Sequence, residues 1–141
     1  MRRSFPRRID ALPAIVAFTR EAMAGLPLDA AQRHAVEFTI EELFTNMVKY
    51  AHNGAAEIAL ELANSGGGLQ VTLIDAGVDR FDVTQAPDAA VDRPIGEREP
   101  GGLGLHLLRR VVDSLSYSYD AERREGRTRF VVSARAAHAD D

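Results

Sequence analysis

The amino-acid sequence predicts an α+β sandwich in which helices cover one face of a mixed or antiparallel β-sheet. Two helical segments come first, alternating strand segments follow in two pairs, and a third helical pattern separates the pairs. With 141 residues, the chain has the length of one ordinary domain. We therefore expect residues 1–141 to form a single domain.

Two helices are predicted in the first third of the chain. In residues 10–24, apolar side chains recur at helical spacing, and Gly25 ends the pattern. Asp29 then begins a second helix, with Gln32 three residues later in the arrangement of a capping box. We expect this helix to end near residue 52, before the turn pair at 53–54.

Four strands and a third helix are predicted in the rest of the chain. Residues 57–63 and 69–75 alternate between apolar and polar side chains and read as an antiparallel hairpin. An amphipathic helix is expected over 103–115. Two further strands follow at 115–121 and 127–135, around a turn at Glu125-Gly126.

Residues 76–101 are predicted to form a long loop, because they contain three prolines and show no periodicity. A loop of about 25 residues inside a compact domain is usually a functional lid or disordered. The two ends of the chain, 1–8 and 136–141, are expected to be flexible. Four arginines in residues 1–8 then read as a solvated arm.

Composition excludes several classes of function. The net charge of −4 argues against a direct nucleic-acid partner, because binding to the phosphate backbone needs a basic surface. With no cysteine, the chain has no disulfide, thiolate metal site or cysteine nucleophile. No apolar run approaches the roughly 20 residues of a membrane span, and no signal peptide is evident, so we expect a cytoplasmic protein without a membrane partner.

A carboxylate and an amide lie side by side on the second predicted helix. At about 100° per residue, Glu42 and Asn46 are about 40° apart on one flank of the apolar face. Glu41 lies on the opposite flank and does not share this position. Spacing alone leaves two interpretations open, a hydrogen-bonded pair on the helix surface or a pair of functional groups.

Two other segments carry candidate functional residues. Asp75 continues the inward row of its strand, where a buried carboxylate needs a hydrogen-bond donor, although it could instead cap a turn. Gly77, two residues later, would let a ligand approach the backbone. The glycines of 101–104 precede a helix and form either an anion site or a flexible hinge.

Taken together, these segments resemble the GHKL, or histidine kinase-like, ATPase superfamily, whose fold is the Bergerat α/β sandwich. The resemblance lies in Glu42-x-x-x-Asn46, in Asp75-x-Gly77 and in GGLGLHLLRRVVD at 101–113. The first and last of these segments are most similar to the anti-sigma-factor serine kinases of bacterial partner-switching systems. One departure is that Phe81 lies four residues past Gly77, where the family usually has an aromatic residue two past the glycine.

The resemblance implies a role for each candidate residue. Asn46 would bind Mg²⁺, and Glu42 would be the general base. Asp75 would accept a hydrogen bond from the amino group of adenine, and Gly77 would admit the base. The phosphates of ATP would lie at Gly102, Leu103, Gly104 and Leu105.

The function implied by the resemblance is an ATP- and Mg²⁺-dependent serine/threonine protein kinase. Its substrate would be a small anti-sigma-factor antagonist protein, and it would sequester a sigma factor; a homodimer also fits the resemblance. Two alternatives stay open. One is a non-catalytic binding module that ATP gates, and the other is a histidine kinase-like catalytic domain that acts on another chain.

Overall fold

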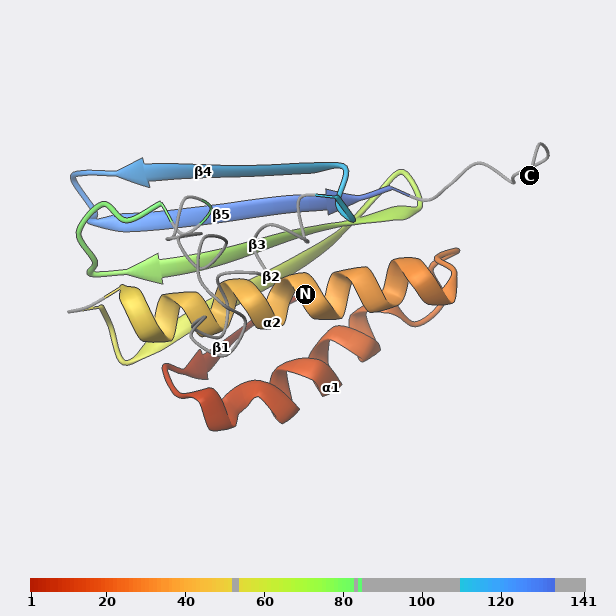
Figure 1. Ribbon diagram of the computed structural model, residues 1–141, viewed down its shortest axis with the longest axis horizontal. Helices are drawn as coiled ribbons and strands as arrows, with labels where there is room; N and C mark the ends of the chain where they lie inside the picture. The colour runs from red at the N-terminus through yellow and green to blue at the C-terminus, as the bar shows by residue number, and fades with distance from the viewer. Residues whose placement is uncertain (52–53, 83, 85–109, 134–141) are drawn as a thin grey trace, which may run out of the picture.

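A computed structural model gives the fold and describes residues 1–51, 54–82, 84 and 110–133. The described strands form one five-stranded sheet in the order β1-β2-β3-β5-β4, and each neighbouring pair is antiparallel. Helices α1 and α2 lie together on one face of this sheet (Figure 1). The predicted α+β sandwich is confirmed, with an antiparallel sheet.

The two predicted N-terminal helices are confirmed. A short 3-10 helix, η1 (Ile9–Ala11), leads into α1 (Leu12–Met23). Helix α2 (Ala30–Tyr50) begins with the predicted capping box: Asp29 accepts a hydrogen bond from the backbone N–H of Gln32, and the Gln32 side chain accepts one from the N–H of Asp29. None of the described helices is long and apolar enough to cross a membrane.

The predicted hairpin consists of β2 (Glu57–Ser65) and β3 (Gly68–Ala76). Gly66 and Gly67, which join the strands, have φ angles of 59° and 88°. This left-handed conformation at both central positions is the one that a two-residue hairpin turn requires, and glycine adopts it without strain.

The inner face of the sheet and the two helices enclose the hydrophobic core. The inward rows of β2 and β3 are buried as predicted, and they pack with apolar side chains of both helices. Phe5 and Phe18 meet edge to face, with ring centroids 5.7 Å apart. Phe18 therefore belongs to the core, whereas Val16 is only half-buried.

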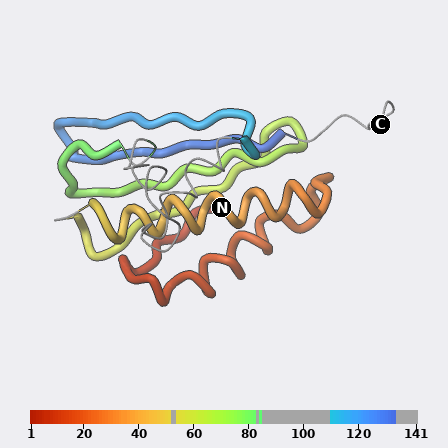
Figure 2. The backbone as a smooth tube through the Cα atoms, viewed as in Figure 1, coloured from red at the N-terminus to blue at the C-terminus, as the bar shows by residue number. Residues whose placement is uncertain are grey.

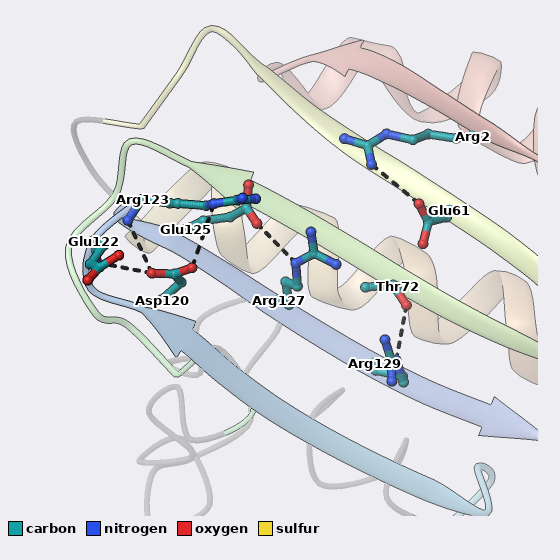
Figure 3. Close-up of polar contacts among 9 residues, drawn as sticks. All are labelled: Arg2, Glu61, Thr72, Asp120, Glu122, Arg123, Glu125, Arg127 and Arg129. Carbon is teal, nitrogen blue, oxygen red and sulfur yellow. Dashed lines mark hydrogen bonds and ion pairs between the residues drawn. The ribbon is translucent and has the colours of Figure 1, made fainter.

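Polar side chains form contacts across the outer face of the sheet (Figure 3). Arg2, Glu61, Thr72 and Arg129 lie in register across four neighbouring strands. Arg2 pairs with Glu61 at 3.3 Å, and Arg129 Nε donates to the hydroxyl of Thr72 at 3.3 Å. A sheet that is covered on one face typically carries such a row of polar groups on the other.

The N-terminal segment differs from the prediction. Residues Arg2–Pro6 form the edge strand β1, which pairs with β2, so the expectation of a flexible arm at 1–8 is wrong for them. Figure 2 shows this segment lying beside a strand more than fifty positions later in the chain. Because pairing over such a separation depends on the tertiary fold, local sequence carries no sign of it.

The C-terminal part also differs in detail. The last strands are β4 (Ser114–Asp120) and β5 (Glu125–Val132), joined by a turn at 121–124. The turn predicted at Glu125-Gly126 is therefore wrong, because both residues lie within β5. Residues 110–113 form a turn and bend, so the predicted helix 103–115 does not extend to its expected end, and its first seven residues lie outside the described part.

Candidate functional site

Asn46 and Glu42 lie one turn apart on α2, and each has a buried polar atom without a partner among the described residues. The side chain of Asn46 is buried, with 1% of its surface exposed. Within the described part of the chain, neither its Oδ1 nor its Nδ2 has a hydrogen-bond partner, and the same holds for the buried Oε2 of Glu42. Native proteins rarely leave buried polar atoms unpaired, and a ligand or ion that supplies the missing partners is one of the usual reasons.

The carboxyl group of Glu42 has a perturbed pKa. Burial raises the pKa above its ordinary value; the negative charge of Glu41 raises it slightly further, and the positive charge of Lys49 opposes both. A carboxylate with a raised pKa is a better proton acceptor than an ordinary exposed one. Burial thus gives Glu42 a higher proton affinity than an exposed glutamate has.

Asp75 lies at the end of β3, buried and paired. Only 4% of its surface is exposed, and Arg7 donates to both carboxylate oxygens, with Nη1 3.4 Å from Oδ2. The sequence requires a donor for this carboxylate, and Arg7 is that donor. Burial raises the pKa of Asp75, and the hydrogen bond and charge of Arg7 offset only part of the rise.

Gly77 follows directly after β3 with a φ angle of 73°. Residues with a side chain rarely adopt this left-handed conformation, so the turn after β3 depends on glycine. Gly77 lies two residues after Asp75, and the approach of a ligand to its backbone stays a prediction.

A small cavity lies between the end of α2, the end of β3 and the two C-terminal strands. Its volume is about 10 Å³, which is about the space that a single water molecule needs. Thr128 lines this cavity, and its hydroxyl is buried without a partner in the described chain. The cavity is lined by Met47, Ala51, Asp75, Val78, Phe81, Tyr117, Gly126 and Thr128.

Gly126 opposes Asp75 in the register of β3 and β5. A Cβ at this position would lie 3.1 Å from the hydroxyl oxygen of Tyr117, a tighter contact than side chains normally make. The glycine therefore serves to let the Tyr117 ring lie close over β5, beside the cavity, which is a common reason for glycine within a strand.

Two tyrosines of β4 hold the segment that follows Gly77. The hydroxyl of Tyr119 donates to the carbonyl oxygen of Val78 at 2.7 Å, and that of Tyr117 accepts from the N–H of Phe81 at 3.1 Å. The Arg80 guanidinium lies over both rings, 5.9 Å from the centroid of Tyr117 and 5.7 Å from that of Tyr119. Arg80 is thus held beside Tyr117, which lines the cavity.

Comparison with known proteins gives the family. Residues 5–131 match the model of the histidine kinase-like ATPase domain. The chain belongs to this family. An ATPase domain binds ATP, so membership implies that this histidine kinase-like ATPase domain has an ATP site.

Two individual proteins are similar to this histidine kinase-like ATPase domain. The serine/threonine-protein kinase BtrW of Bordetella bronchiseptica is 28% identical over 107 residues, which cover 74% of this chain and 72% of BtrW. A solved structure of the histidine kinase AdeS of Acinetobacter baumannii matches with a TM-score of 0.51 at 14% identity, covering 96% of this chain and 68% of the chain in that structure. At that identity, the likeness to AdeS shows the fold alone.

The structure places two of the three predicted site segments of this ATPase domain next to each other. Asp75 lies against the last turns of α2, because one guanidinium bridges both, and α2 carries Glu42 and Asn46. Gly77 follows at the same end of the sheet. The other predicted site residues lie outside the described part of the chain, namely Gly102, Leu103, Gly104 and Leu105.

Sequence reasoning missed Arg7, Tyr117 and Thr128. Arg7 is one of four arginines in eight residues, and nothing local distinguishes it from the others. Tyr117 and Thr128 have the appearance of ordinary strand residues. The one available signal for any of them was indirect, since the inward position of Asp75 requires a donor from elsewhere in the chain.

Proposed function

We propose that this protein is a serine/threonine protein kinase that uses ATP and Mg²⁺. The observation that carries the proposal is the pair on α2, the Asn46 amide without a partner in the described chain and, one turn earlier, the Glu42 carboxylate with a raised pKa. Family membership supports the ATP, and the similarity to BtrW, a serine/threonine-protein kinase, supports the reaction.

Asn46 fits the role of a metal ligand. Its amide oxygen is a hard neutral ligand that suits Mg²⁺, which prefers oxygen and keeps waters and phosphate oxygens in its shell. Bound there, Mg²⁺ would neutralise charge on the phosphates of ATP. The described residues contain no cluster of three or more acidic, histidine or cysteine side chains that could hold a metal by itself, so ATP would supply most of the remaining ligands.

Glu42 is the proposed general base. It would take the proton from a serine or threonine hydroxyl of the substrate, while the hydroxyl oxygen forms a bond to the γ-phosphorus and the bond from that phosphorus to the bridging oxygen of ADP breaks. The products are ADP, a phosphoprotein and a protonated Glu42. Such a base typically contributes a factor of about 10² to 10⁴ to the rate.

Asp75 and Thr128 are the proposed contacts of the adenine base. Asp75 would accept a hydrogen bond from the adenine amino group, and the Thr128 hydroxyl, which has no partner in the described chain, would bind a ring nitrogen directly or through water. Guanine has a carbonyl in place of this amino group, so the carboxylate would disfavour GTP. The cavity beside Asp75 has to widen to admit a base.

The proposed substrate is a small anti-sigma-factor antagonist protein, and the proposed second partner is a sigma factor. Both follow from the likeness of residues 42–46 and 101–113 to the anti-sigma-factor kinases. The kinase would bind and sequester the sigma factor as long as the antagonist carries the phosphate.

Transfer of labelled phosphate tests the proposed activity. The purified protein is incubated with γ-labelled ATP and an extract of its source organism, and label is followed into small proteins. Acid-stable phosphoserine or phosphothreonine that Glu42→Gln abolishes and the neighbouring variant Glu41→Gln leaves intact would support the proposal. Acid-labile label would indicate a histidine kinase-like reaction, and an absence of label despite ATP binding would favour a binding module.

A further inference from the structure

Arg7 connects the elements that build the candidate nucleotide site. Its Nε donates to the carbonyl oxygen of Ala55 at 2.8 Å, and its Nη1 lies 3.4 Å and 3.3 Å from the carbonyl oxygens of Met47 and Ala51. Both Nη atoms also contact the carboxylate of Asp75. One guanidinium thus joins the end of α2, the segment before β2 and the end of β3.

The guanidinium approaches Asp75 from outside the cavity. Asp75 is one of the residues that line the cavity, and Arg7 is not among them. Each carboxylate oxygen has two lone pairs, so a carboxylate that accepts from one arginine can still accept from a ligand. Arg7 therefore contacts the Asp75 carboxylate from the side away from the cavity. The side of the carboxylate that faces the cavity is left for a ligand.

We propose that Arg7 is a positioning residue for nucleotide binding, which holds the Asp75 carboxylate ionised and in a fixed orientation for the amino group of adenine. This inference rests on the proposed function, which assigns adenine to Asp75. An arginine that donates to both oxygens of a carboxylate restricts the position and the rotation of that carboxylate, because the guanidinium is planar and rigid.

The charges around Asp75 support this role. Among the described residues, Arg7 supplies the only charge that affects the pKa of Asp75, and it lowers that pKa against the rise caused by burial. On β5, Glu125 and Arg127 flank the position opposite Asp75 and pair with each other at 3.0 Å. On β4, Tyr117 lines the cavity and its hydroxyl is neutral. Burial raises the pKa of this hydroxyl above its ordinary value. Without Arg7, the pKa of Asp75 would rise, and the protonated carboxyl would lose acceptor capacity.

Gly54 is an independent sign that the chain accommodates this guanidinium. A Cβ at position 54 would overlap Nη2 of Arg7 and lie 2.5 Å from its Cζ. The φ angle of Gly54 is not in the left-handed region, so alanine suits its φ. The missing side chain therefore leaves space both for Arg7 and for Val78, whose Cγ1 would lie 2.8 Å from the added Cβ. Gly54→Ala should displace the guanidinium without removing either charge, and it also crowds Val78 at the cavity.

The test compares ATP binding by calorimetry, from mildly acidic to mildly alkaline pH, in the wild type, Arg7→Met, Arg7→Lys and Gly54→Ala. Arg8→Met is the matched control, because Arg8 is exposed, pairs with Asp10 at 2.7 Å and carries the same charge. Affinities are expressed relative to the wild type at each pH, so that protonation of the ATP phosphates cancels.

We expect Arg7→Met to weaken ATP binding roughly tenfold to hundredfold at neutral pH, the range of a lost charge-assisted hydrogen bond. Its loss of affinity on acidification should begin at a higher pH than in the wild type, because Asp75 is protonated more easily. Arg7→Lys should restore part of the affinity, Gly54→Ala should shift the profile in the same direction as Arg7→Met, and Arg8→Met should match the wild type. An NMR titration of the Asp75 carboxyl without nucleotide should show the same order of pKa values.

Two results would overturn this inference without affecting the proposed function. One is that Arg7→Met binds ATP with the affinity and the pH profile of the wild type. The other is that Arg7→Met binds ATP more tightly, which would mean that Arg7 competes with adenine for Asp75. If the wild type binds no ATP, the proposed function fails as well. Thermal unfolding checks that each variant folds, and if Arg7→Met does not fold, Arg7→Lys decides the outcome, because Gly54→Ala also crowds Val78 at the cavity.

Discussion

Replacing Asn46 with leucine should stabilise the free protein and abolish Mg²⁺-dependent ATP binding. The side chain is 1% exposed, and both polar atoms of its amide lack a partner in the described chain. A buried polar group without a partner costs about 1–3 kcal/mol, and an apolar side chain of similar length removes that cost. The free energy of unfolding should rise by this amount, which for a domain of this size raises Tm by roughly 3–10 °C.

The assay is thermal unfolding without Mg²⁺ or nucleotide, followed by circular dichroism. Thr39→Val is the matched control on the same helix, because Thr39 is equally buried but its hydroxyl donates to the carbonyl oxygen of Ala35 at 2.7 Å. Losing that hydrogen bond should lower stability by about 0.5–1.5 kcal/mol. If Asn46→Leu also lowers stability, the amide has structural partners, and the claim that it is reserved for a ligand is refuted.

Three further predictions follow from the same site. Because the pKa of Glu42 is raised in the folded protein, the contribution of Glu42 to stability declines as the pH rises from its unfolded pKa through its folded pKa. Glu42→Gln should remove this decline when urea unfolding is measured across pH, and an unchanged pH dependence in the variant would contradict the raised pKa. Gly77→Ala forces a side chain into a left-handed conformation, so it should lower the free energy of unfolding by about 1–2 kcal/mol and weaken ATP binding, and a neutral effect in chemical denaturation would count against the strained turn. Tyr119→Phe removes the bond to Val78 and should cost about 1 kcal/mol in the same assay, whereas unaltered stability would mean that the bond contributes nothing.

Much of the fold could be predicted because it depends on local patterns. The capping box at Asp29 and the alternation of the β2–β3 hairpin both require only neighbours in the sequence, and both are confirmed. The β1 strand and the exact role of Gly126 could not be predicted, because each depends on a partner far along the chain. Gly126 looks like a turn residue in the sequence, yet it lies within β5, where the missing side chain leaves space for Tyr117.

The candidate site was predictable to a similar extent. The positions of Glu42 and Asn46 follow from helical geometry, and the inward direction of Asp75 follows from strand alternation. The identity of the donor to Asp75 does not follow, because Arg7 reaches it across 68 positions of sequence. Burial of the Asn46 amide was also not predictable, since a flank of the apolar face can be open or covered depending on the packing of the sheet.

The central claim is that α2 forms one wall of a Mg²⁺-ATP site, and calorimetric titration of ATP with and without Mg²⁺ tests it most directly. We predict that Mg²⁺ strengthens ATP binding by the wild type, that Asn46→Ala loses this dependence, that Asp75→Asn loses ATP binding, and that GTP binds more weakly than ATP. ATP binding that is the same with and without Mg²⁺, and unchanged in Asn46→Ala, would contradict the assignment of the metal to α2.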